Sequence, residues 1–264
     1  MNSNPWSMQR KVVYLSVVLS VLFVGLVVPL VFFLKQDPTC FDGKKNGDEV
    51  DVDCGGTCEL LCSFDRLQPI IVWSRAFPVV SGVYSAVAYI QNPNLGTEAL
   101  GTYTFRLYDA QGALIATRQN TTFIPKNKAI AVFEPNVSVV SGSTTTVPAR
   151  VTFEFTGETL WRKNLAPSPE IAVSKNILTQ ADTSPRVDAD VTNKTSERLQ
   201  RVEVVAIVYN DLGNAIGASR TFVDELLPGE TKHVVFTWAE PLIALGSTPP
   251  SVVEVIPRVI PRSW

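Results

Sequence analysis

The sequence predicts a mainly β protein: an N-terminal transmembrane helix, a small disulfide-rich segment and two tandem antiparallel immunoglobulin-like β-sandwich domains. Three observations predict this class: one long uncharged apolar run, a cluster that holds all four cysteines, and a repeat of about 101 residues with two-residue hydrophobic alternation. The expected parts are a cytoplasmic head at 1–11, the helix at 12–34, the Cys-rich acidic segment at 35–65, and the sandwiches at 66–165 and 166–264.

The composition excludes two broad classes of protein. The 264 residues are 45% hydrophobic and 18% charged, which is unlike a disordered chain. The formal net charge is −2, whereas a generic nucleic-acid-binding protein is normally basic. We therefore expect no nucleic-acid partner.

The apolar run is Val12–Leu34, 23 residues without a charge, and it accounts for a mean hydropathy of +0.15. As a helix it would be roughly 34 Å long, enough to cross a hydrocarbon core of about 30 Å with some tilt. Signal-peptide cores are shorter, at about 7–15 residues, and end at a small-residue cleavage site, which is missing after Leu34. The run therefore favours an uncleaved membrane anchor over a signal peptide.

The orientation of this anchor follows from what flanks it. Positive charges stand on both sides in nearly equal number, so the positive-inside rule does not decide. The N-terminal flank is only 11 residues long, and every cysteine follows the run. We expect a single-pass protein of the cell membrane, with its N-terminus cytoplasmic and its C-terminal domains extracytoplasmic.

Cys40, Cys54, Cys58 and Cys62 are the only cysteines. An even, clustered number beyond a membrane span predicts two disulfides in an oxidising compartment. Three pairings are possible, and the sequence does not choose among them. The alternative is a zinc site of four thiolates, but structural zinc usually uses cysteines two residues apart, and the gaps here are 13, 3 and 3.

The same segment is acidic, with eight Asp or Glu and two Lys between residues 37 and 65. Closely spaced oxygen side chains, with Gly47 at a sharp turn, fit a calcium-type loop, so calcium is the candidate cofactor. Lys44 stands where an EF-hand has an oxygen ligand, and no flanking helices are evident. The alternative is an acidic, disulfide-tied spacer. The candidate calcium ligands are Asp42, Asn46, Asp48, Asp51 and Asp53.

From Cys40 to Cys58 the chain reads C-x-D-G-x-x-N-G-x-E-x-D-V-D-C-G-G-x-C. This pattern resembles a short Cys-rich repeat of extracellular microbial proteins. The resemblance implies an extracytoplasmic module and no particular activity. The sequence departs from the pattern at Cys62, which follows Cys58 after three residues rather than two.

The remainder of the chain reads as two copies of one β-domain. Tyr103–Asp109 is parallel to Val204–Asn210, and Asn92 is parallel to Asn193. Alternate residues in these runs are apolar, and β-branched and aromatic types dominate, which favours strands. We expect Leu227–Glu230, with its Pro-Gly pair, to form a type II turn.

Turn residues close the strand pattern in both copies. Residues 109–112 and 210–213 put Asp or Asn first and Gly fourth, which is typical of a type I turn followed by a left-handed glycine. The first copy has Pro125 and Lys126 near the place of the Pro-Gly turn, so a type I turn is expected there, because lysine tolerates a positive φ poorly.

Phe105–Asp109 reads F-x-L-Y-D and is followed by Gly112. This run resembles the FxLYD domain, a small β-sandwich module of bacteria and archaea. The second copy has the weaker match Ala206–Asn210. The resemblance implies an extracytoplasmic accessory fold without known chemistry.

The residues offer little for catalysis. His233 is the only histidine, and no cysteine lies outside the cluster. A Ser-His-Asp or Cys-His catalytic site could therefore form at only one place, around His233. Asp188 and Asp190 alternate on one strand and should both face solvent. We expect no enzyme and no catalytic residue, but a membrane-anchored extracytoplasmic binding or scaffold protein of a microbial envelope, with a protein or glycan partner. The alternatives are a structural or accessory subunit of a larger envelope assembly, of secretion, pilus or surface-layer type, and, less favoured, a hydrolase.

Overall fold

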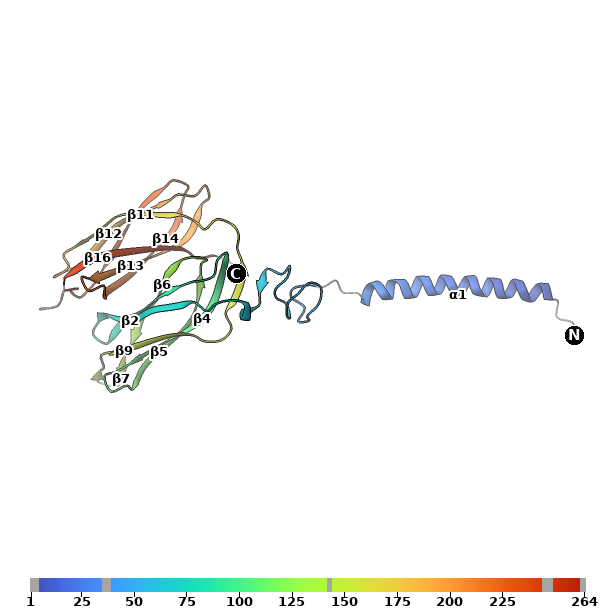
Figure 1. Ribbon diagram of the computed structural model, residues 1–264, viewed down its shortest axis with the longest axis horizontal. Coiled ribbons are helices and arrows are strands. Elements are labelled where there is room, and N and C mark those ends of the chain that lie inside the picture. The colour runs from blue at the N-terminus through green and yellow to red at the C-terminus, as the bar shows by residue number, and fades with distance from the viewer. Residues whose placement is uncertain (1–4, 35–38, 142–143, 244–248, 262–264) are drawn as a thin grey trace. The chain divides into compact units, whose positions relative to one another are not determined.

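The computed structural model describes residues 5–34, 39–141, 144–243 and 249–261. The chain divides into two compact units, Met1–Cys58 and Glu59–Trp264, which are described separately. The protein is mainly β, as expected, with one helix in the first unit and antiparallel sheets in the second (Figure 1).

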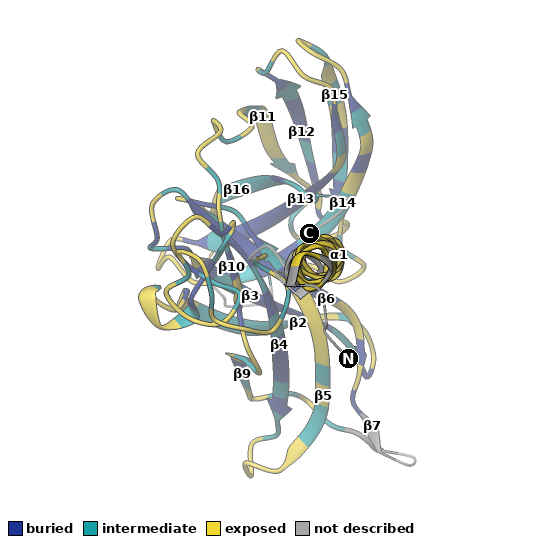
Figure 2. Ribbon diagram, turned by 90° about the vertical axis from the view of Figure 1, so that its right-hand side faces the viewer, coloured by how far each residue is buried: buried dark blue, intermediate teal, exposed yellow. Residues whose placement is uncertain are grey.

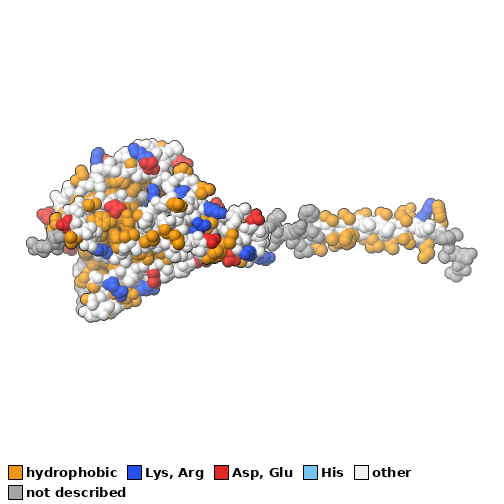
Figure 3. All heavy atoms as spheres, viewed as in Figure 1, with side chains coloured by type: hydrophobic (Ala, Val, Ile, Leu, Met, Phe, Trp, Pro, Cys, Tyr) orange, Lys and Arg blue, Asp and Glu red, His pale blue; other side chains and the backbone are white. Residues whose placement is uncertain are grey.

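The first unit begins with α1, Pro5–Leu34. Proline is favoured in the first helical turn, because its missing N–H would have no partner there. The stretch Met8–Leu30 is long and apolar enough to cross a membrane, and none of its most apolar window is buried. Apolar side chains run along the helix in Figure 3, and Figure 2 shows it exposed. The predicted apolar helix is confirmed, and it could anchor the protein in a membrane.

The second unit contains two sets of strands and a short 3-10 helix, η1 (Ser63–Asp65). The first half has one sheet in the order β1-β10-β4-β5, with β9 also paired to β4, another in the order β2-β3-β6, and the small pair β7-β8. Its strands are β1 (Leu60–Leu61), β2 (Ile70–Val80), β3 (Val83–Gln91), β4 (Thr97–Tyr108), β5 (Leu114–Ile124), β6 (Ala129–Ser138), β7 (Val140–Ser141), β8 (Thr144–Thr145), β9 (Arg150–Phe155) and β10 (Leu160–Lys163).

The second half has the sheets β11-β12-β15 and β14-β13-β16. Its strands are β11 (Ile171–Thr179), β12 (Arg186–Asn193), β13 (Leu199–Asn210), β14 (Ala215–Leu226), β15 (Thr231–Thr237) and β16 (Pro250–Val259). The order β2-β3-β6 recurs as β11-β12-β15, and β9-β4-β5 recurs as β16-β13-β14. The repeat seen in the sequence is therefore a repeat of strand order, while the immunoglobulin-like type and the boundary at 165/166 stay predictions.

Each half has its own hydrophobic core between its sheets. Phe105 and Leu107, the apolar members of the F-x-L-Y-D run, are fully buried in the first core with Trp161. Leu61 of β1 joins the same core, so the folded region begins before residue 66. The second core is built mainly from valines, among them Val204 and Val208 of β13.

A third hydrophobic cluster joins the two halves. It contains Phe77, Val87, Ala131 and Phe133 of the first half and Val205, Ile207, Ala215 and Ala218 of the second. Sheet β2-β3-β6 therefore packs its outer face against the outer face of sheet β14-β13-β16. Strand β13 is buried on both faces, because alternate residues along a strand point to opposite sides.

Asn92 and Asn193 hold equivalent loops in the two halves. The side-chain amide of Asn92 donates to the carbonyls of Thr97 and Pro125, at 2.8 and 3.1 Å. That of Asn193 donates to the carbonyls of Glu197 and Leu226, at 2.7 and 3.0 Å. Both side chains are buried, so each satisfies backbone groups that would otherwise lack partners.

The turns follow the expected chemistry, with one exception. Gly112 and Gly213 are left-handed, with φ of 83° and 73°. The expected type I turn at Pro125–Lys126 is wrong: Asn127, which occupies the place of Gly229, has a φ of 51°, whereas a type I turn has a negative φ there. Asparagine tolerates this region better than lysine does, so the chain puts it at the left-handed position.

Candidate functional site

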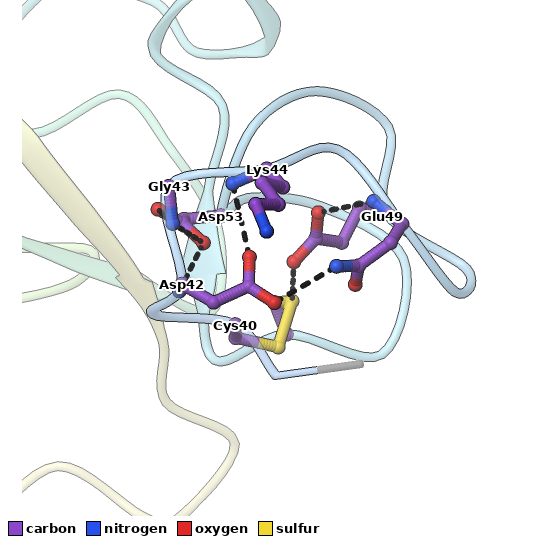
Figure 4. Close-up of a disulfide and its surroundings, with 8 residues drawn as sticks. Cys40, Asp42, Gly43, Lys44, Glu49 and Asp53 are labelled. Atoms are coloured by element: carbon purple, nitrogen blue, oxygen red, sulfur yellow. Dashed lines mark hydrogen bonds between the residues drawn. A yellow bond between two sulfur atoms is a disulfide. The ribbon is translucent and has the colours of Figure 1, made fainter. Parts of the chain in front are cut away.

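The first candidate is the Cys-rich loop at 39–58 (Figure 4). Cys40 and Cys58 form a disulfide with Cα atoms 5.7 Å apart, and Cys54 and Cys62 are also disulfide-bonded. The two predicted disulfides are confirmed, and the pairing that the sequence left open has Cys40 with Cys58. A site of four zinc thiolates is not compatible with this bonding.

The loop carboxylates accept hydrogen bonds from the loop's own backbone. Asp53 accepts from the N–H groups of Asp42 and Gly43, both at 2.9 Å. Asp42 accepts from the N–H of Lys44 at 2.9 Å and from the side-chain amide of Asn46 at 2.8 Å (Figure 4). The bond from Asn46 is the main cause that lowers the pKa of Asp42.

Three of the five candidate calcium ligands thus lie together, namely Asp42, Asn46 and Asp53. Asp51 uses one carboxylate oxygen on the N–H of Val52, at 2.8 Å, and joins none of these bonds. Asp48 contributes its backbone instead: its carbonyl oxygen lies against Gly56, where an added Cβ would sit 1.8 Å from it. Gly55 and Gly56 are therefore required for two reasons: both have a positive φ, and neighbouring atoms leave no space for a Cβ.

Glu49 was not among the predicted ligands, yet it lies inside the loop. Its carboxylate accepts from the N–H of Asn46 at 3.0 Å. In the described residues, Glu49 with Cys40 and Cys58 forms a convergent group of metal-ligand types, but the two sulfurs are bonded to each other. The spacing of Glu49 three residues after Asn46 is the signal that could have identified it. Calcium at this loop stays a prediction.

The second candidate is the carboxylate pair around His233. Nδ1 of His233 lies 3.0 Å from Asp190, and Nε2 lies 2.9 Å from Asp188. The two aspartates face the same way from β12, as predicted, but the expectation that both face solvent is wrong for Asp190, which is buried, while Asp188 is half-buried. Hydrogen bonds that the ring makes to Asp190, and then to Asp188, raise the pKa of His233. Hydrogen bonds that Asp188 accepts, first from Arg186 and then from His233, hold the pKa of Asp188 at about 2.

The third candidate is a cavity of about 240 Å³ in the second unit, which we term the Lys126 cavity. Strands of both halves and the connection at 164–170 between them form its walls. The cations that line it are Lys126, Lys128, Arg162 and Arg258, and Glu98 is the carboxylate among its lining residues. Phe123, Ile130, Ile171 and Val259 supply apolar wall.

Two of these cations have carboxylate partners. Arg162 pairs with Glu98 at 2.6 Å. Arg258 forms an ion pair with Glu203, and donates to Thr122 Oγ1 at 2.9 Å and to the carbonyl of Phe123 at 2.8 Å. Arg258 therefore links the second half to the first.

The two lysines bind neutral oxygens. Lys126 Nζ donates to the carbonyl of Asn164 at 2.6 Å and to that of Ala166. Lys128 Nζ donates to the carbonyl of Pro169 at 3.1 Å. The sequence carried no signal for this site, because it depends on a turn and a connection about 40 residues apart in the chain.

No protein-family model matches the chain, and no curated protein matches it. Among solved structures, a red sea bream transglutaminase aligns at 13% identity with a TM-score of 0.24, over 75% of this chain and 32% of that one. A Bacteroides uniformis β-glucuronidase aligns at 13% identity with a TM-score of 0.20, over 61% of this chain and 22% of that one. These scores are too low to show a common fold.

Proposed function

We propose that this chain is a non-enzymatic, membrane-anchored binding or scaffold protein, with its β unit outside the cytoplasm of a microbial cell. One observation carries the proposal. All four cysteines are disulfide-bonded, and they follow an exposed apolar helix long enough to cross a membrane. Disulfides persist in oxidising compartments, which supports an N-terminus inside and a C-terminus outside.

The geometry at His233 supports binding rather than hydrolysis. Both ring nitrogens face aspartates, so neither is left to activate a hydroxyl nucleophile. The side chain is 54% exposed, on the surface of a sheet. A solvated imidazole held between two carboxylates is typical of a surface ion-pair cluster.

A protein or glycan partner has an edge strand to contact. Strand β5 ends its sheet and exposes several polar side chains over Thr117–Thr121. An unpaired strand edge can add a strand from a partner through backbone hydrogen bonds. We propose β5 as the partner-binding edge of the first half.

The orientation is tested in cells that express the full chain. A membrane-impermeant protease added to wall-stripped cells should digest the β unit, and a thiol reagent should find no free cysteine before reduction. Protection from protease together with reactive thiols would contradict the proposal. Native sizing after gentle extraction then separates the alternatives, because a subunit of a larger envelope assembly would run far above the 28.9 kDa chain.

A further inference from the structure

Lys126 is a charged side chain in an unusual setting. It is only 8% exposed, and its Nζ is bound by the carbonyls of Asn164 and Ala166, with Asn164 Oδ1 at 3.4 Å. No carboxylate of the described residues lies within ion-pair distance of it. A buried ammonium without a counter-ion is costly, so an anion beside it would be stabilised.

The charges around the Lys126 cavity do not balance. Glu98 offsets Arg162, and Glu203 offsets Arg258 from the second half. Lys126 and Lys128 remain, and both bind only neutral carbonyl oxygens in the described structure. The cavity therefore has an excess of two positive charges, at the end where the connection 164–170 crosses it.

Beside its charged groups, the cavity has a substantial share of apolar wall. Phe123 and Ile130 come from the first half, and Ile171 and Val259 come from the second. The volume of about 240 Å³ is well above what a single water needs and admits a small organic molecule. A wall of this kind suits a small molecule with a compact hydrocarbon body.

We propose that the Lys126 cavity binds a small organic carboxylate, with its anionic group at Lys126 and Lys128 and its apolar body against Phe123, Ile171 and Val259. The pairing is charge-assisted at one end and hydrophobic at the other. A phosphate fits less well, because a dianion needs several free donors, whereas Arg162 and Arg258 are already paired with Glu98 and Glu203. This site does not depend on membrane anchoring, and it lies at the end of β5 beyond the exposed stretch Thr117–Thr121 that we propose for partner binding.

A purely structural role for the lysines makes a different prediction. If they only hold the connection 164–170 in place, their removal lowers stability, but the wild-type protein shows no preference for carboxylates. A matched pair of ligands separates the two roles. Phenylacetate and phenylacetamide have the same size and differ in charge, so their difference in affinity reports the positive site.

The full chain, reconstituted in lipid nanodiscs, is titrated with both compounds by calorimetry and by ligand-observed NMR. Phenylacetate should bind at least about tenfold more tightly than phenylacetamide, and Lys126→Met should remove that preference. Lys232→Met is the matched control, since Lys232 is a half-buried lysine that also donates to a backbone carbonyl but does not line the cavity, and this variant should bind as wild type does.

Equal affinity for the two compounds, or no binding of either, overturns the proposal. So does an unchanged preference in a folded Lys126→Met protein. Should Lys126→Met fail to fold, Lys128→Met carries the test, because Lys128 is exposed and its loss leaves a single bond to Pro169 unmade. That variant should weaken phenylacetate severalfold and leave phenylacetamide unchanged. None of these outcomes depends on the orientation of α1, so failure here leaves the proposed function standing.

Discussion

His233 shows how neighbouring carboxylates set the charge of one side chain. Asp190 and Asp188 approach its two nitrogens from the adjacent strand, and each favours the protonated ring. Lys175 and Arg186 pair with the same two aspartates and share their negative charge. The result is a small ion-pair network on the exposed surface of sheet β11-β12-β15.

This network predicts a pH dependence. The pKa of His233 in the folded protein lies above its ordinary value of 6.5, so its stabilisation is complete below that pH and is lost as pH rises through the folded pKa. Because the chain has one histidine, NMR of its ring proton gives the pKa directly. Wild type should exceed His233→Gln in thermal midpoint by more at about pH 5.5 than at about pH 8.5. A pKa at or below 6.5 would contradict this.

The loop at 39–58 is an element stabilised by its own side chains. Carboxylates of Asp42, Glu49 and Asp53 accept backbone N–H groups, and a disulfide closes the loop. This arrangement agrees with the spacer interpretation and leaves lone pairs for a cation. The two hypotheses therefore differ in response to calcium, not in static geometry.

The calcium hypothesis predicts that a chelator lowers the thermal midpoint of the full chain and that calcium restores it, since a ligand that binds the native state stabilises it. Asp53→Asn should abolish the calcium shift. Asp109→Asn is the control, because Asp109 closes a turn in the second unit and should keep the shift. No change on chelation would leave the loop as a hydrogen-bonded spacer.

Elements with strong local signals were predictable, and contacts over long range were not. The apolar helix and the turns at Gly112 and Gly213 follow from local composition. The left-handed Asn127 was missed because Lys126 was assigned the wrong turn position. The Lys126 cavity was missed because it forms only where the turn at Lys126 meets the carbonyl of Asn164, which is distant in the sequence. No pattern in a single sequence reports that proximity.

At the scale of the whole second unit, the halves are joined by more than a connection. Arg75 donates to the carbonyl of Ala215 at 3.0 Å, and Glu254 accepts from Tyr89 and Tyr209, both at 2.9 Å. Burial and the negative charge of Glu254 raise the pKa of Tyr89 to about 12. The uninterrupted apolar run Val204–Val208 is the sequence signal for this contact, because a strand buried on both faces loses its alternation.

Val204 and Val205 are adjacent on β13 and face opposite sides, which allows a matched test. Val205→Asp places a carboxylate in the apolar contact between the halves, opposite Arg220, which already pairs with Glu203, and should weaken that contact by a few kcal/mol, roughly 3–5 at most. Separation of the two halves returns the introduced carboxylate to water, so the variant favours halves that no longer pack together. Calorimetry should then show two unfolding transitions, one for each half, in place of one. Val204→Asp lies inside the second core and should unfold that half. A single, merely lowered transition for Val205→Asp would show that the halves do not fold separately.

Asn193 has a practical consequence for producing this protein. Asn193-Lys194-Thr195 is an acceptor sequence for N-linked sugar, and its amide is fully buried with two carbonyl partners. A eukaryotic secretory host that attached a glycan there during synthesis would leave no room for β12 to close against its loop. Bacterial expression under conditions that allow the disulfides to form avoids this glycosylation without altering the sequence.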